Sequence, residues 1–248
     1  MGIEPPLTEQ SPSIGWRGRD FALVMIAGLT VGGAMYLAAF ALGWSDDALV
    51  VTSAIGQYAG HFLGLLALAR RRGGSASLGF VVAPSDLWYV GLGLVLQVAL
   101  PLLFFPLANL VGEGEAGQAV SDQIRQLGGL GGRMAMALVV GVLAPITEEV
   151  MFRGVLLKAL EGLGRRVAIT VSALVFAGFH LFGLSGDLVR GAVLTMPTFF
   201  LMGVILASVT RRRGRLGPAI FIHSGFNLLA LLVLLMPPEL VDRLMNSQ

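Results

Sequence analysis

The sequence predicts an all-α protein, a polytopic membrane helix bundle of about seven spans. Hydrophobic residues make up 55% of the chain and mean hydropathy is +0.80, whereas charged residues make up only 13%. A water-soluble domain carries about a quarter of charged residues, so this composition does not fit one. The apolar residues also gather in stretches of about 20, the length that crosses the hydrocarbon core of a bilayer.

Seven such stretches follow one another, at 21–43, 48–69, 87–111, 134–160, 166–185, 189–210 and 217–236. Basic residues group at alternate ends of these stretches, at 17–19, 70–72, 158–166 and 211–215. Acidic residues occupy the other ends, at 46–47, 113–122, 187 and 239–242. Because cytoplasmic loops carry the excess of Lys and Arg, the alternation predicts a cytoplasmic N-terminus.

Four regions are expected along the chain. They are a cytoplasmic tail at 1–20, accessory spans one to three with an outer loop at 21–132, a catalytic membrane core at 133–236, and a C-terminal tail at 237–248. Pro101 and Pro106 predict a kink or break in the third span. Within the outer loop, the amphipathic stretch 120–127 is consistent with either an interfacial helix or a flexible loop.

Three charged residues lie inside the fourth span: Glu148, Glu149 and Arg153. Insertion scales put the cost of an Asp, Lys or Arg at a helix centre at about 2.5–3.5 kcal/mol, so such residues are functional by default. Glu149 and Arg153 have the four-residue spacing at which a carboxylate and a guanidinium meet on one helix face. Glu148 points about 100° away and has no partner on its own helix, which makes it the better candidate for a general base.

Two later spans carry polar side chains one helical turn apart. Phe176 precedes His180 in the fifth span, and His223 precedes Asn227 in the seventh. With about 1.5 Å rise per residue, His180, His223 and Asn227 fall at depths that allow them to converge with the glutamates. Each could instead be a plain interhelical hydrogen-bond partner, and the glutamate cluster could be an ion pair that fixes helix register. His61 has no partner at helical spacing and is assigned a structural role.

The three motifs together resemble those of the CAAX-protease and bacteriocin-processing family, which includes the Ras-converting prenyl-protein endopeptidase and its bacterial Abi relatives. The motifs are Glu148-Glu149 with Arg153, Phe176 with His180, and His223 with Asn227, in this order on three separate spans. The resemblance covers about 145–230. Residues before this region match no motif of the family.

The resemblance implies a metal-independent glutamate endopeptidase that works within the membrane. Carried over by position, Glu148 would activate a water for attack on the scissile carbonyl, and His180 would help to hold that water. His223 and Asn227 would form the oxyanion hole. Glu149, Arg153 and Phe176 would support the site. No cofactor is implied.

Other functions remain open. Glu148, His180 and His223 could ligate zinc in a membrane metalloprotease, although the sequence lacks a His-Glu-x-x-His pair. The chain could also be a non-proteolytic scaffold, immunity or transport protein that binds a sensor kinase or another membrane partner. The absence of cysteine excludes thiolate nucleophiles and thiolate metal ligands. The expected partners are a peptide or membrane-protein substrate and the lipid bilayer, with no nucleic acid. The bias to Arg over Lys, with abundant Ala, Gly and Val, favours a bacterial protein of the inner membrane.

Overall fold

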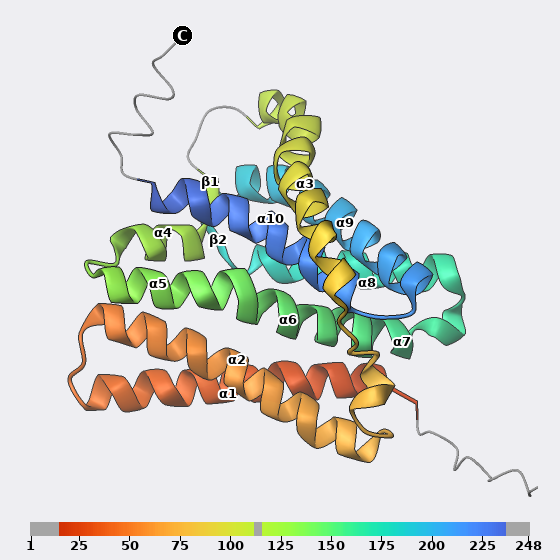
Figure 1. The fold of residues 1–248 in the computed structure, drawn as a ribbon. Helices are drawn as coiled ribbons and strands as arrows, with labels where there is room; N and C mark the ends of the chain where they lie inside the picture. The colour runs from red at the N-terminus through yellow and green to blue at the C-terminus, as the bar shows by residue number, and fades with distance from the viewer. Residues whose placement is uncertain (1–14, 112–115, 237–248) are drawn as a thin grey trace, which may run out of the picture.

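The computed structural model describes residues 15–111 and 116–236, which form an all-α helix bundle with two very short strands (Figure 1). Within these residues, six helical segments are long and apolar enough to cross a membrane: Gly18–Ala41, Asp46–Arg71, Pro84–Leu110, Leu130–Ala159, Leu188–Arg213 and Gly217–Leu235. The predicted class, an integral polytopic bundle, is confirmed. The expectations for residues 1–14, the acidic residues at 113–115 and the tail at 237–248 lie outside the described residues.

The remaining predicted span, 166–185, is shorter than expected. Helix α8 covers Arg165–Leu181, which is 17 residues, or about 25 Å at 1.5 Å per residue. The chain then leaves the helix and enters strand β2 (Leu184–Gly186), which pairs antiparallel with β1 (Ala116–Gln118). Six segments, and not seven, therefore have the length of a full span among the described residues.

Helices α1 (Gly18–Ala41) and α2 (Asp46–Arg71) form an antiparallel hairpin, seen along the lower edge of Figure 1. The hairpin is packed around glycine, as is common for membrane helices. The His61 ring occupies the space beside Gly28, where an added Cβ would lie 1.9 Å from the ring. His61 is buried and its ring nitrogens have no hydrogen-bond partner among the described residues. A packing role for His61 is consistent with this position.

Two short 3₁₀ turns, η1 (Ser75–Leu78) and η2 (Pro84–Trp88), lead into α3 (Tyr89–Phe104). The break expected from the prolines occurs at the end of α3, where the chain continues as the 3₁₀ helix η3 (Phe105–Leu110). Helix α3 crosses α10 (Gly217–Leu235) at a very short distance. A Cβ on Gly93 would lie 2.1 Å from the carbonyl oxygen of Ile222, and one on Gly225 would lie 2.3 Å from that of Val90. Only glycine allows this approach, which fixes the helix that carries His223 and Asn227.

The amphipathic stretch 120–127 forms a helix, α4 (Ala119–Gln126). Its Ile124 and the following Leu127 are buried in a small apolar cluster with Met136 and Leu231. The Ser185 hydroxyl donates to the Asp122 carboxylate at 2.7 Å. Helix α4 therefore packs on the end of the bundle, and its apolar face is covered by the protein itself.

The helix with the glutamates is the most buried of the six spans. It runs without interruption through five segments: α5 (Leu130–Leu138), η4 (Val139–Leu143), α6 (Ala144–Glu149), η5 (Val150–Leu156) and α7 (Leu157–Ala159). In its most apolar stretch 56% of residues are buried, against 11–44% in the other spans. Figure 1 shows it running between the α1–α2 hairpin and α10. Its charged groups are thus enclosed by protein.

After the short turn η6 (Glu161–Leu163), α8 and α9 (Leu188–Arg213) pack against each other and lead to α10. The start of α1, the end of α2, α7, and the junction of α9 with α10 all lie at the right-hand side of Figure 1. These are the segments that carry the four basic groups of the sequence. The described helices thus bring the basic groups to one end of the bundle, hereafter the basic end.

Candidate active site

The two glutamates lie on α6, between two π-helical segments, η4 and η5. A π-helix has a wider turn than an α-helix and occurs often at functional sites. A uniform α-helical turn, assumed from the sequence, is therefore wrong for this segment. Glu149 is fully buried and Glu148 is 7% exposed, so the two neighbours have different surroundings.

Glu149 is held by two partners. Its Oε1 accepts a hydrogen bond from Nη1 of Arg153 at 2.9 Å and another from Nδ1 of His223, also at 2.9 Å. Arg153 donates a further hydrogen bond from Nη2 to the carbonyl oxygen of Gly203 on α9, at 3.2 Å. The ion pair expected from the four-residue spacing is present. Its carboxylate also joins α6 to α10 through His223.

Glu148 has weaker contacts. Its Oε1 accepts a hydrogen bond from the Tyr58 hydroxyl of α2 at 3.2 Å. Its Oε2 lies 3.9 Å from Nε2 of His223, beyond hydrogen-bond distance, and has no partner among the described residues. One oxygen of Glu148 is thus bonded, while the other, next to an imidazole nitrogen, is available.

The His223 ring lies between the two carboxylates. Because a carboxylate only accepts, Nδ1 of His223 carries a hydrogen and donates it to Glu149. In the neutral ring Nε2 then has a lone pair, and in the charged ring it carries a second hydrogen. Glu149 thereby sets the orientation of the ring and presents Nε2 toward Glu148.

Phe176 lies at the centre of this cluster. The Arg153 guanidinium stacks over its ring at 4.4 Å, and the His223 and His180 rings meet its edges with centroid distances of 5.7 and 4.7 Å. A cation over an aromatic face and aromatic pairs at these distances are both favourable contacts. Phe176 therefore positions members of all three motifs, although its own side chain has no reactive group.

His180 joins the cluster through packing. Its Nδ1 donates to the carbonyl oxygen of Phe176 at 2.9 Å, one helical turn earlier, and its ring stacks on Phe199 of α9 at 3.8 Å. With Nδ1 bonded in this way, Nε2 is the free nitrogen of the ring. His180 makes no hydrogen bond to either glutamate among the described residues.

Asn227 makes its hydrogen bond to the helix that carries the glutamates, but at a point away from them. Its Nδ2 donates to the carbonyl oxygen of Val140 in the π-helical segment η4, at 2.9 Å. The bond satisfies an acceptor within the widened turn and ties α10 to the glutamate helix. A carboxamide has two N–H donors, so this contact leaves one for another partner. The structure thus joins Glu148, Glu149, Arg153, Phe176 and His223 closely, with His180 and Asn227 attached at the edges.

Sequence reasoning missed Tyr58. It lies on α2, outside the three motifs, and a single tyrosine in an apolar span carries no signal of its own. The one cue in the sequence is that Tyr58 precedes His61 by three residues, close to one helical turn. In the structure the two rings meet edge to face, with centroids 5.9 Å apart. The possible zinc ligands do not gather either. Across 15–111 and 116–236, no group of three His, Asp or Glu side chains is arranged to hold a metal ion.

Comparison with known proteins agrees with the geometry. Residues 131–229 match the family described as type II CAAX prenyl endopeptidase Rce1-like. The comparisons found no match among curated proteins and none among solved structures. The matched segment extends from α5 into α10 and holds all three motifs, whereas Tyr58 lies outside it. The family is one of proteases, so the match indicates a peptide-bond hydrolase with a substrate in the membrane. The resemblance seen in the motifs is thereby confirmed for this segment: residues 131–229 match the Rce1-like type II CAAX prenyl endopeptidase family.

Proposed function

We propose that the protein is an intramembrane endopeptidase in which Glu148 activates water to cut a peptide bond of a membrane-associated peptide or protein. The observation that carries this proposal is the difference between the two glutamates. Oε1 of Glu149 is bonded to Arg153 and His223, so this fully buried carboxylate is compensated by an ion pair, although its Oε2 also lacks a partner among the described residues. Glu148 has no ion pair within hydrogen-bond distance, and its Oε2, unpartnered among the described residues, lies 3.9 Å from Nε2 of His223. A general base needs such an available oxygen, within reach of a water molecule.

The reaction needs one proton acceptor that later becomes a donor. Glu148 takes a proton from water as the water oxygen attacks the scissile carbonyl carbon, and the carbonyl oxygen becomes an oxyanion. The protonated Glu148 then gives the proton to the leaving amine nitrogen as the C–N bond breaks. The products of this step are a carboxylic acid and an amine, and Glu148 returns to its charged form. The acid then gives its remaining proton to the amine, which leaves a carboxylate and an ammonium group.

The histidines and Asn227 stabilise the charge that develops. Preorganised N–H donors at the oxyanion are among the largest single contributions to such catalysis. Asn227 has an N–H left after its bond to Val140, and His223 can donate from Nε2 when its ring is charged. His180 has Nε2 free to hold the attacking water. These roles follow the family motifs and fit the atoms that the described contacts leave unused.

Glu149, Arg153 and Phe176 position these groups. Arg153 neutralises Glu149, Glu149 orients His223, and Phe176 packs against Arg153, His180 and His223. The supporting residues thus fix the His223 ring that faces Glu148. Misplacement of this ring would lower the turnover number.

The test uses the purified protein reconstituted in liposomes with a library of peptides that are anchored to the membrane. New peptide ends are identified by mass spectrometry. The wild type and a matched control, Asp46→Asn on the exposed first turn of α2, should cut the same peptides. Glu148→Gln should cut none of them. Binding of peptides by all three proteins without any cleavage would instead indicate a non-proteolytic scaffold.

A further inference from the structure

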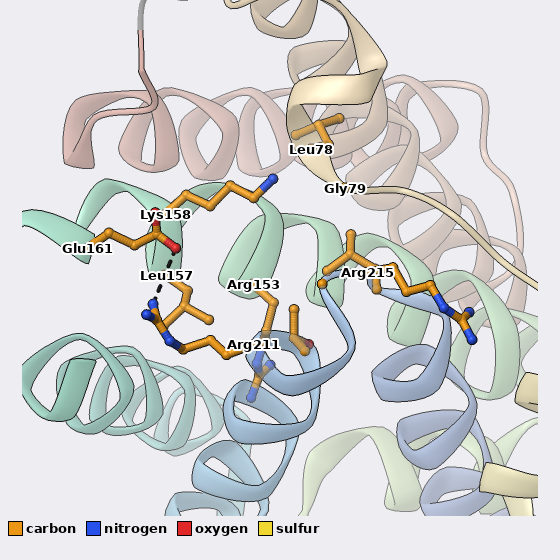
Figure 2. Close-up of a pocket in the computed structure, with 11 residues that line it drawn as sticks. Leu78, Gly79, Arg153, Leu157, Lys158, Glu161, Arg211 and Arg215 are labelled. Carbon is orange, nitrogen blue, oxygen red and sulfur yellow. Dashed lines mark hydrogen bonds and ion pairs between the residues drawn. The ribbon is translucent and has the colours of Figure 1, made fainter. Parts of the chain in front are cut away.

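Two adjoining cavities lie at the basic end of the bundle and share Lys158 and Glu161. The smaller holds about 230 Å³ and is also lined by Arg153, Thr210 and Arg211; Figure 2 shows it. The larger holds about 380 Å³, and its wall includes Trp16, Arg72 and Ser77. The proposed reaction takes place in neither cavity, although Arg153, which lines the smaller one, also pairs with Glu149.

The cavity walls carry more positive than negative charge. Five basic side chains contribute, against the single carboxylate of Glu161: Arg72, Arg153, Lys158, Arg211 and Arg215. The four arginines each pair with a carboxylate, namely Asp20, Glu149, Glu161 and Asp86. The Lys158 ammonium donates to the Ser77 carbonyl oxygen at 2.6 Å and bonds no carboxylate among the described residues. Lys158 is therefore the basic side chain of these walls that makes no ion pair among the described residues, although Glu161 lies near enough to interact with its charge.

Figure 2 shows how these groups lie. The Arg211 guanidinium faces the Glu161 carboxylate, at 3.2 Å, while the Arg215 side chain points away from them. The Lys158 ammonium points toward the segment at Leu78 and Gly79. Lys158 thus separates the two cavities and is in reach of a ligand in either.

Two residues that line the smaller cavity each have a polar atom without a partner in the described part of the chain. The Thr210 hydroxyl and Nε of Arg153 are buried and make no hydrogen bond among the described residues. A buried donor without a partner costs about 1–3 kcal/mol. Both groups can donate, but neither atom is exposed to the cavity, so the contact with a ligand comes from the Lys158 ammonium on its wall. A tetrahedral anion with several oxygens has the matching chemistry.

The position of the cavities identifies the source of the anion. They open where the helices end, and the Trp16 indole at this level donates to the Ser77 carbonyl oxygen at 3.2 Å. Tryptophan gathers at the membrane–water boundary, and basic pockets between helices there bind anionic headgroups. We propose that the paired cavities bind the phosphate of an anionic phospholipid headgroup, with Lys158 as the main charged contact. This site does not depend on the proposed proteolysis.

The arrangement predicts opposite effects for two neighbouring residues. Lys158→Met should weaken binding of phosphatidylglycerol about tenfold, the change expected for losing one hydrogen bond to a charged group. Lys158→Arg should retain most of the binding. Glu161→Gln should strengthen binding, because it removes the only carboxylate on the walls. Arg166→Gln is the matched control, since it removes a charge at the same end from an exposed position outside both cavities.

Binding can be measured by the fluorescence of Trp16. The chain has three tryptophans, so a Trp44→Phe/Trp88→Phe background leaves only Trp16. The full-length protein in detergent micelles is titrated with phosphatidylglycerol or phosphatidylcholine carrying brominated acyl chains, which quench a nearby indole. Saturable quenching by phosphatidylglycerol at lower concentration, weakened by Lys158→Met but not by Arg166→Gln, would support the site.

Three results would overturn the proposal. Equal quenching by the two lipids would show that the site does not select an anionic headgroup. Equal losses of phosphatidylglycerol binding in Lys158→Met and Arg166→Gln would indicate a general attraction to the whole basic end. A third arm adds inorganic phosphate to the phosphatidylglycerol complex. Displacement at phosphate concentrations similar to those of the lipid would assign the site to the free anion. Thermal melting of each variant shows whether it is folded. If Lys158→Met does not fold, the test uses Lys158→Arg, which should retain most of the binding.

Discussion

The Tyr58 hydroxyl donates a hydrogen bond to Oε1 of Glu148 at 3.2 Å, across the interface between α2 and the glutamate helix. Tyr58 lies outside the segment that matches the protease family, 131–229. The bond leaves Oε2 as the available oxygen and directs it toward His223. The α1–α2 hairpin therefore contributes a contact to the candidate site.

Tyr58→Phe should lower kcat about 10- to 100-fold, which corresponds to the loss of one hydrogen bond to a charged group. The ring and its packing remain, so thermal melting in detergent should change little. Tyr36→Phe is the matched control, because Tyr36 is 42% exposed on α1. Wild-type turnover in Tyr58→Phe would show that the bond has no part in positioning Glu148.

The buried pair of Glu149 and Arg153 should dominate the stability of the core. Glu149→Ala or Arg153→Ala leaves a buried charge without its partner, which costs roughly 3–5 kcal/mol. Both should lower the melting temperature in detergent and reduce activity. Glu149→Gln combined with Arg153→Met removes both charges and should recover part of the lost stability. Two single variants that melt like the wild type would contradict the importance of the pair.

His223 and Asn227 should act in the transition state. Removing one oxyanion donor typically costs about 10²–10³ in kcat. Asn227→Ala and His223→Ala should each show a fall of this order with KM nearly unchanged. If both serve one oxyanion, the double variant should lose less than the product of the two effects. A rise in KM alone would place these residues in substrate binding.

Activity should not depend on a metal ion. The described residues lack a group of three side chains arranged to hold one, and a glutamate base needs no Lewis acid. Dialysis against EDTA or phenanthroline should leave turnover of a peptide substrate unchanged. Loss of activity on chelation, with recovery on addition of zinc, would support the metalloprotease reading of Glu148, His180 and His223.

The sequence allowed the fold class and one central contact of the candidate site, the ion pair of Glu149 with Arg153, to be predicted, because both depend on local patterns. Stretches of about 20 apolar residues define spans without knowledge of their packing. The four-residue spacing of Glu149 and Arg153 was enough to predict their ion pair, which the structure contains. The order of the motifs predicted the family that the match at 131–229 confirms.

Features that depend on how helices rotate and cross could not be predicted. The contact of Tyr58 with Glu148 spans 90 positions of the chain and depends on how α2 is rotated against α6. The π-helical segments on both sides of α6 change the angle between successive side chains, so a uniform turn of 100° misplaces them. The acceptor of the bond from Asn227, the carbonyl oxygen of Val140, lies in one of these π-helical segments. Helix α8 ends before strand β2, whose pairing with β1 joins two three-residue segments that are far apart in the sequence.

The most direct test of the central claim is the turnover number of Glu148→Gln on a peptide that the wild type cuts. Glutamine keeps the shape of the side chain and can still accept from Tyr58, but it cannot take a proton from water. General-base catalysis contributes about 10²–10⁴-fold. We expect kcat to fall by at least this order while the melting temperature stays close to that of the wild type. Wild-type turnover in a folded Glu148→Gln protein would contradict the account.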